Sequence, residues 1–324
     1  MPITVHFATN RALTGPGDVL ASYSADIVPP TDPAAITYAT AFVNDADLTG
    51  DTVGAVTAIQ NVSRGGFPPE AIGDLSDPGR NLLVFIHGFA NSFEDAITRA
   101  AFNTQWLSGS NVPGADTAVV AFIWPSLGRV LSFPIPTADY QTDQVMAGQS
   151  GPHLMSFFAN LLPLAQAARA KGRRTALVAH SMGNWALQAG LESWFAHGNG
   201  PATLFDEAIL AAADERSDSL SFPRLGRLSG LSRVASHVSV YFSLSDRVLD
   251  VSRIINGTER LGQRGPDKGS DPTLFPPSIY RMADCTAFRD FDFNFANSHQ
   301  YYRRSPGVRD DIAAAVAGIR RPVA

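Results

Sequence analysis

Cysteine, lysine and long apolar runs are scarce in this chain of 324 residues. The single cysteine, Cys285, excludes an intramolecular disulfide and a thiolate metal cluster, and we expect it to behave as a small buried apolar residue. Lysine occurs only at positions 171 and 268, and arginine supplies the other basic residues. We read this scarcity of lysine as a bias in genomic base composition, with no functional meaning.

The chain also lacks a membrane-spanning segment. Its most apolar stretch, Leu154 to Ala170, is interrupted by Asn160, Pro163 and Gln166 and falls short of a membrane span. The first nine residues, MPITVHFAT, contain neither the basic start nor the apolar core of a secretory signal. A cytoplasmic location is therefore the expectation.

Cofactor motifs are missing as well. The sequence contains no HExxH, EF-hand loop, P-loop or G-x-G-x-x-G fingerprint, and its histidines lack the spacing of metal ligands. We therefore expect no metal and no organic cofactor. The net charge of -5 and the pI near 5.8 argue against a nucleic-acid partner, because phosphate binding needs concentrated positive charge.

What the chain does have is a regular alternation of apolar runs and helical stretches from residue 82 onward. With 45% hydrophobic and 17% charged residues, the length allows one large α/β domain or two smaller ones. The alternation predicts a mostly parallel central sheet with helices on both faces. The expected strands are 82–86, 118–124, 175–179, 207–213, 237–243 and 279–285, and the expected helices follow Ser92 and cover 150–172, 182–191 and 310–319.

The first 80 residues are harder to interpret. Ile3 to Ala8 and Ile36 to Phe42 are typical of strands, but proline and glycine break the remainder into short pieces. No linker-like change of composition follows. We therefore expect residues 1–80 to join the same sheet and residues 1–324 to form a single domain.

The chain turns from strand to helix at Ser181, in the stretch TALVAHSMGNWALQAG. Residues 175–179 predict a buried strand, and the apolar spacing from Met182 onward is helical. Such an abrupt turn favours small residues two places before and after the serine, which here are Ala179 and Gly183. This A-x-S-x-G string predicts a nucleophilic serine; the alternative is a serine that only caps a helix.

A serine nucleophile needs a histidine base and an acid that orients it. In this kind of sheet the order along the chain is serine, acid, histidine. Of seven histidines only His299 follows the expected strand 237–243 and Asp246, so we predict His299 as the base. We predict Asp246 as the acid, because the acid usually follows the penultimate strand. Asp214, after the preceding strand, remains the alternative acid. Asp250 has the character of a solvated helix residue.

The string His87-Gly88-Phe89 ends a strand where an oxyanion hole is expected. Gly88 allows the backbone to bend, so the predicted donors are the backbone amides of Phe89 and Met182. His87 precedes the elbow and is predicted to be structural. Ser126 also has a glycine two residues later, but no helical period follows it promptly, which disfavours it as a nucleophile.

Several strings resemble the α/β-hydrolase superfamily, in particular a bacterial esterase/lipase-like branch whose members are mostly uncharacterised. They are FATNR, VFIHGF, FIWPS, Tyr140-x-x-Asp143, AHSMGN, the SxSD segment ending at Asp246, and RLGQRGP at 260–266. The resemblance implies the α/β-hydrolase fold and a small-molecule ester substrate cleaved through an acyl-enzyme. An acyltransferase, lactonase or amidase with the same residues is the alternative, and a non-catalytic ligand-binding protein is less favoured because the order Ser181, Asp246, His299 is intact.

The surroundings of the site are expected to include His87, Trp124, Tyr140 and Asp214 in the substrate pocket. The chain departs from the branch between Ser126 and Pro152, because Phe133 to Pro136 and Gly148 to Pro152 break the lead into the next helix. Residues 126–150 and 253–278 are the expected covers over the pocket, since long loops often act as lids. No pattern predicts an acyl-chain length or an oligomeric state.

Overall fold

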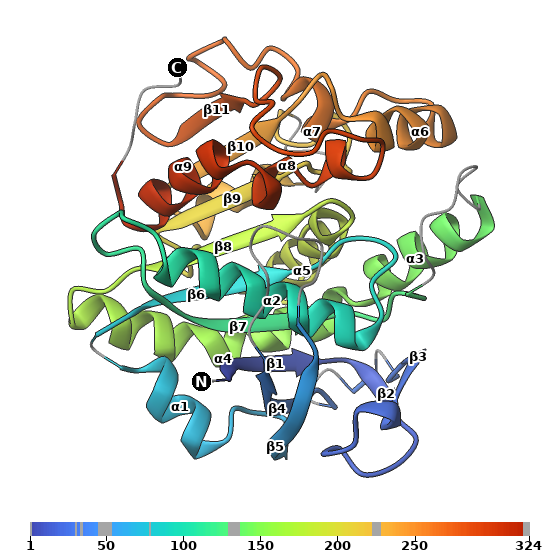
Figure 1. Ribbon diagram of the computed structural model, residues 1–324, viewed down its shortest axis with the longest axis vertical. Coiled ribbons are helices and arrows are strands. Elements are labelled where there is room, and N and C mark those ends of the chain that lie inside the picture. The colour runs from blue at the N-terminus through green and yellow to red at the C-terminus, as the bar shows by residue number, and fades with distance from the viewer. Residues whose placement is uncertain are drawn as a thin grey trace.

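A nine-stranded sheet runs through the protein, and helices cover both of its faces (Figure 1). The computed structural model describes residues 2–29, 31–32, 35–44, 54–77, 79–128, 137–221 and 228–319. The strands of the sheet, in spatial order, are β11 (Tyr280–Asp284), β10 (Val238–Phe242), β9 (Glu207–Ala211), β8 (Thr175–His180), β6 (Asn81–Ile86), β7 (Thr117–Ile123), β1 (Ile3–Thr9), β4 (Thr37–Val43) and β5 (Val56–Arg64). Neighbours are parallel from β11 to β1, so the predicted mostly parallel sheet is confirmed.

The sheet is buried on both faces, and successive side chains along a strand point alternately into two hydrophobic cores. Leu82, Val84 and Ile86 of β6 face one core, whereas Leu83 and Phe85 face the other. The first core contains α4 (Gly151–Ala170) and α5 (Gly183–Ala196), and the second contains α2 (Phe93–Ser108) and α9 (Pro306–Val316). Because both faces are covered, the strands are continuous apolar runs, which is the pattern that the sequence displays.

The remaining elements are short or lie at the edges of the fold. They are β2 (Arg11–Leu13) and β3 (Tyr23–Ile27), which form a separate two-stranded sheet, the helices α1 (Pro69–Leu75), α3 (Thr137–Gln149), α6 (Arg247–Asn256), α7 (Leu261–Arg264) and α8 (Tyr301–Arg304), and the 3₁₀ helices η1 (Leu20–Ser22), η3 (Leu228–Arg233) and η4 (Asn297–His299).

The amino-terminal strands extend the main sheet. Strand β1 lies parallel to β7, with His6 opposite Val120, and β4 and β5 add two antiparallel neighbours at the edge. The predicted strands 3–8 and 36–42 correspond to β1 and β4. The sequence did not predict β5, because this edge strand is largely exposed and has no strong apolar pattern.

Helix α2 begins where the sequence predicted a cap. The Ser92 hydroxyl accepts a hydrogen bond from the Asp95 amide at 3.0 Å, and the Asp95 carboxylate accepts one from the Ser92 amide at 2.9 Å. This reciprocal capping satisfies backbone donors that a helix start leaves without partners. It also fixes the first turn of α2 beside the end of β6, where the site is built.

The two expected covers contain more helix than the sequence indicated. Residues 137–149 form α3, so the expectation of a long loop over 126–150 is wrong there, and residues 129–136 lie outside the described part of the chain. Polar residues on most sides of α3 hid its helical period. Residues 253–278 include the end of α6, α7 and a series of turns. Within the described ranges, no helix is long and apolar enough to cross a membrane.

Phe157 of α4 tests the core on the first face of the sheet. Its side chain is fully buried, and its ring centroid lies 5.6 Å from that of Phe122 and 6.1 Å from that of Phe158. We expect Phe157→Ala to lower the free energy of unfolding by about 3 to 5 kcal/mol, because it leaves a cavity. Ile254→Ala is the control, since Ile254 is 74% exposed, and should change it by about 0.5 kcal/mol or less. Urea denaturation of both variants measures the difference; equal losses would contradict this account of the core.

Candidate active site

Ser181 occupies the sharp turn between β8 and α5. Its φ angle is +54°, a left-handed conformation that is rare for a residue with a side chain. Two backbone hydrogen bonds hold this turn: the Ser181 amide donates to the Ala211 carbonyl at 3.0 Å, and the Asp214 amide donates to the Ser181 carbonyl at 3.1 Å. The end of β9 therefore supports the strained serine from the neighbouring strand.

Close packing at Gly183 explains why a small residue follows the serine. A Cβ atom built there would lie 2.5 Å from the His87 carbonyl oxygen and 2.6 Å from that of Ile86. Any side chain at this position would collide with the backbone at the end of β6. The start of α5 can approach β6 only because residue 183 is glycine.

Ser181, His299 and Asp246 form a continuous chain of hydrogen bonds. The Ser181 hydroxyl lies 2.8 Å from His299 Nε2, and His299 Nδ1 lies 2.7 Å from an Asp246 carboxylate oxygen. These contacts make Nδ1 the protonated nitrogen and leave Nε2 as the acceptor for the hydroxyl proton. All three side chains are buried. The structure thus brings together the three residues that the order along the chain selected.

Asp246 is fixed by the helix that it caps. Its other carboxylate oxygen accepts hydrogen bonds from the amides of Val248 and Leu249, at 3.1 and 3.0 Å, in the first turn of α6. Burial raises the pKa of Asp246, while the His299 imidazole and these two amides oppose that effect. The carboxylate has a fixed direction, so it presents one oxygen to the histidine and the other to the helix.

A second buried histidine, His180, packs against His299. The ring of His180 lies 4.9 Å from that of His299, and its Nε2 lies 3.2 Å from the His299 carbonyl oxygen. Burial lowers the pKa of His180 well below its ordinary value, and the nearby His299 acts in the same direction. His180 is therefore neutral at pH 7 and can donate one hydrogen bond to the backbone that carries His299.

Gly88 brings a second loop against the nucleophile. A Cβ atom at Gly88 would lie 2.7 Å from Cβ of Ser181, so the peptide between residues 88 and 89 lies beside the serine. In the described part of the chain, the backbone amides of Phe89 and Met182 have no hydrogen-bond acceptor. Met182 also stands at the start of α5, where the helix dipole favours negative charge. Both amides are thus available to an oxyanion next to Ser181.

Asp143 of α3 holds the loop that carries Gly88 and Phe89. Its carboxylate accepts hydrogen bonds from the Ala90 amide at 3.3 Å, from the Leu127 amide at 2.9 Å and from the Ser126 hydroxyl. Ser126 in turn accepts one from the Asn91 amide. Ser126 therefore has a structural position away from the base, in agreement with the sequence argument against it as a nucleophile.

The expectation that His87 and Trp124 border the substrate pocket is wrong. The rings of these two residues stack on each other, with centroids 4.9 Å apart, and both are buried beneath the loop. Trp124 Nε1 donates to the His87 carbonyl at 2.8 Å. Burial lowers the pKa of His87 to about 3, so its ring is neutral. The two stacked rings pack against the backbone at residues 87 and 88.

The pocket beside Ser181 has a volume of about 270 Å³. Phe89, Val248, Val251 and Ile255 contribute apolar surface, and Ile255 is the only pocket residue among residues 253–278, all of which the structure describes. Tyr140 and Asp214, both predicted to lie around the pocket, are part of its wall. Arg99 and Arg303 also line this pocket. The sequence did not predict either arginine, because neither lies in a recognised motif.

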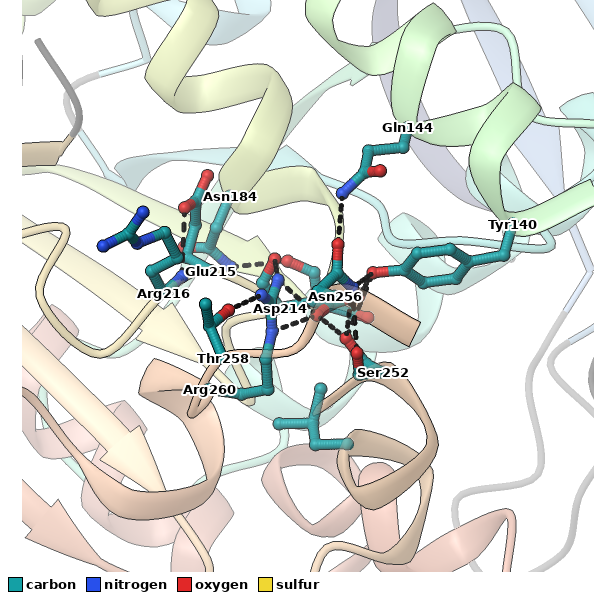
Figure 2. A network of polar contacts seen from close by, with 12 residues as sticks. Tyr140, Gln144, Asn184, Asp214, Glu215, Arg216, Ser252, Asn256, Thr258 and Arg260 are labelled. Atoms are coloured by element: carbon teal, nitrogen blue, oxygen red, sulfur yellow. Dashed lines mark hydrogen bonds and ion pairs between the residues drawn. The ribbon is translucent and has the colours of Figure 1, made fainter. Parts of the chain in front are cut away.

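Asp214 belongs to a buried polar network beside the pocket, and Figure 2 shows this network. Its carboxylate lies 2.8 Å from the Arg260 guanidinium and accepts hydrogen bonds from Ser252 and, at 2.8 Å, from the Tyr140 hydroxyl. Burial and the Asp214 charge raise the pKa of Tyr140, so its hydroxyl keeps the proton that it donates. Asp214 is therefore committed to Arg260, and His299 has its partner in Asp246.

The network also connects α3 to α6. Asn256 of α6 donates to the Tyr140 hydroxyl at 2.9 Å and accepts a hydrogen bond from Gln144 at 3.1 Å. Figure 2 shows Tyr140 and Gln144 reaching from α3 toward this point. The two helices that flank the pocket are thus joined by polar contacts.

Arg11 and Asp143 also support the site, although the sequence had shown them only as members of motifs. Arg11, in the string FATNR, donates to the carbonyls of Ser126 at 2.8 Å and Asn91 at 3.3 Å. Asp143 ends the Tyr140-x-x-Asp143 string. Residues of both strings therefore contact the loop after β6, Arg11 through Asn91 and Asp143 through Ala90. Within the described ranges, no cluster of three His, Cys, Asp or Glu side chains is placed to hold a metal ion.

Comparison with known proteins gives one family. The family described as alpha/beta hydrolase of unknown function (DUF900) matches residues 70–315, which is more than half of the chain. The matched range runs from α1 to α9 and includes Ser181, Asp246 and His299. No curated protein matches the chain.

The Asp214–Arg260 pair provides a test of the network. We expect Arg260→Met to lower the free energy of unfolding by about 3 to 5 kcal/mol, because it leaves the Asp214 carboxylate buried without its cation. The control is Arg264→Ala, which removes an exposed pair with Glu259 and should cost about 1 kcal/mol at most. Urea denaturation measures both variants, and a loss for Arg260→Met no larger than that of the control would refute the assigned role of the network.

Proposed function

The chain belongs to the alpha/beta hydrolase family of unknown function (DUF900), and on that premise we propose that it is a serine hydrolase that cleaves carboxylic esters through an acyl-enzyme. The observation that carries the proposal is the hydrogen-bonded series Ser181, His299, Asp246, with the serine on a strained turn at the start of a helix. This arrangement suits nucleophilic attack by a serine that a histidine deprotonates.

In the proposed reaction, Ser181 Oγ attacks the ester carbonyl while His299 Nε2 takes the hydroxyl proton. The carbonyl oxygen becomes negatively charged and accepts hydrogen bonds from the amides of Phe89 and Met182. Asp246 keeps the imidazole oriented and stabilises its positive charge. The alcohol leaves with the proton from His299, and an acyl group remains on Ser181.

Water then repeats the sequence in the second half of the reaction. His299 takes a proton from water, the resulting hydroxide attacks the acyl group, and the carboxylic acid leaves while Ser181 recovers its proton. The buried position of the three side chains supports this scheme, because hydrogen bonds to developing charge are stronger where water is excluded.

Labelling by a fluorophosphonate probe tests the nucleophile. We expect the wild-type protein to be labelled and to hydrolyse p-nitrophenyl esters, and Ser181→Ala to lose labelling and to lose about 10⁴-fold or more in kcat. Ser126→Ala keeps the nucleophile and should still be labelled, at Ser181, as peptide mass spectrometry can locate. Labelling of Ser181→Ala at the wild-type rate would exclude the proposal.

The acid can be tested separately from the nucleophile. We expect Asp246→Asn to lower kcat by about 10⁴-fold, because the amide is neutral and can turn its NH₂ group toward His299 Nδ1, which favours the tautomer that carries the proton on Nε2. Asp250→Asn is the matched control on the same helix and should keep wild-type turnover, since Asp250 contacts Gln263 and Arg253. Steady-state ester hydrolysis measures both variants. Equal rates for Asp246→Asn and the wild type would assign the acid to another residue.

A further inference from the structure

Two arginines in the active-site pocket have no acidic partner. Arg99 of α2 and Arg303 of α8 both line the cavity that contains Ser181 and His299. In the part of the chain that the structure describes, neither guanidinium forms an ion pair with a carboxylate. Arg260, in contrast, has the buried partner Asp214. The two kinds of arginine therefore differ in what neutralises their charge.

Arg303 is deeply buried for a side chain without a counter-charge. It is 6% exposed; its Nε donates to the Gln300 side chain at 2.8 Å, and its guanidinium carbon lies 5.4 Å from the centre of the Phe102 ring. Its Nη1 is buried and has no hydrogen-bond partner. A buried cationic donor without an acceptor is costly, and an acceptor supplied by a ligand would remove this cost.

The two positive charges are close enough to affect each other. Burial, together with the smaller effect of the Arg99 charge, lowers the pKa of Arg303 to about 10. Arg303 nevertheless remains protonated at neutral pH. Two like charges that share a pocket repel each other, and an anion between them would remove this repulsion.

The carboxylates around the pocket are already committed to other groups. Asp95, one turn before Arg99 on α2, accepts hydrogen bonds from the amide and hydroxyl of Ser92. Asp214 is paired with Arg260, and Asp246 with His299. Asp95 offsets part of the positive charge, but it does not contact either guanidinium. None of these carboxylates is therefore the ion-pair partner of Arg99 or Arg303 in the described part of the chain.

We propose that this pocket binds esters that carry a carboxylate, and that Arg99 and Arg303 bind that carboxylate. The inference rests on the function proposed above and adds a substrate class to it. Guanidinium groups suit this task, because their planar donors match the two oxygens of a carboxylate. Phe89, Val248 and Ile255 supply apolar surface for the uncharged part of the substrate.

Matched ester pairs test the proposal by activity. In the first pair, mono-p-nitrophenyl succinate carries a carboxylate on its acyl group and p-nitrophenyl butyrate is neutral. In the second pair, 4-acetoxybenzoate carries a carboxylate on its alcohol group and 4-acetoxybenzamide is neutral. We expect the wild type to prefer the charged member of at least one pair. Arg99→Gln and Arg303→Gln should each reduce that preference in kcat/KM by about 10- to 100-fold, as for the loss of a charged hydrogen bond. Arg304→Gln, next to Arg303 but outside the pocket wall, should preserve it.

Binding provides a readout that does not depend on turnover. In the Ser181→Ala background, calorimetric titration with succinate, glutarate and 4-hydroxybenzoate should show binding of at least one anion, weakened about tenfold or more by Arg99→Gln. Arg99 is only half-buried, so this variant remains informative if Arg303→Gln does not fold.

The outcomes separate the two proposals. Hydrolysis of neutral esters without arginine-dependent binding or preference overturns the anion site and leaves the serine hydrolase standing. Arginine-dependent binding without hydrolysis of any ester overturns the hydrolase and leaves the anion site. Equal kcat/KM for the charged and neutral members of both pairs, together with no measurable anion binding, overturns the substrate class outright.

Discussion

The left-handed backbone at Ser181 is the constraint on which the site depends. A serine in this conformation is unfavourable by itself, and the two hydrogen bonds to the end of β9 hold it. The same turn requires glycine at 183, because α5 begins in contact with the backbone after β6. The close approach then brings Gly88 against the serine. One strained residue therefore fixes the relative positions of three strand ends.

Sequence reasoning succeeded where the physical signal is local. The parallel strands are continuous apolar runs because helices cover both faces of the sheet, and the turn at Ser181 follows from a strand, a small residue and a helix in direct succession. His299 was selected by its order along the chain, and Asp246 was preferred to Asp214 because it follows the penultimate strand. Their distances could be known only from the structure, since the two residues are 53 positions apart.

The misassigned residues are those whose place depends on packing between distant segments. His87 and Trp124 follow neighbouring strands, as pocket residues do, but their stacking turns both side chains under the loop. Arg99 and Arg303 lie far apart in the sequence and meet only because α2 and α8 cover adjacent parts of the same face. A basic residue in a helix has no local pattern that separates a solvated arginine from one that faces a cavity.

Asp246 performs two tasks with the two oxygens of one carboxylate: it orients His299 and it caps α6. The same helix contributes Val248, Val251 and Ile255 to the pocket. A displacement of α6 that reshapes the pocket would also rotate the carboxylate and so disturb the alignment of the imidazole. Diversification of this pocket along α6 is therefore restricted to the replacement of side chains on a helix that keeps its position.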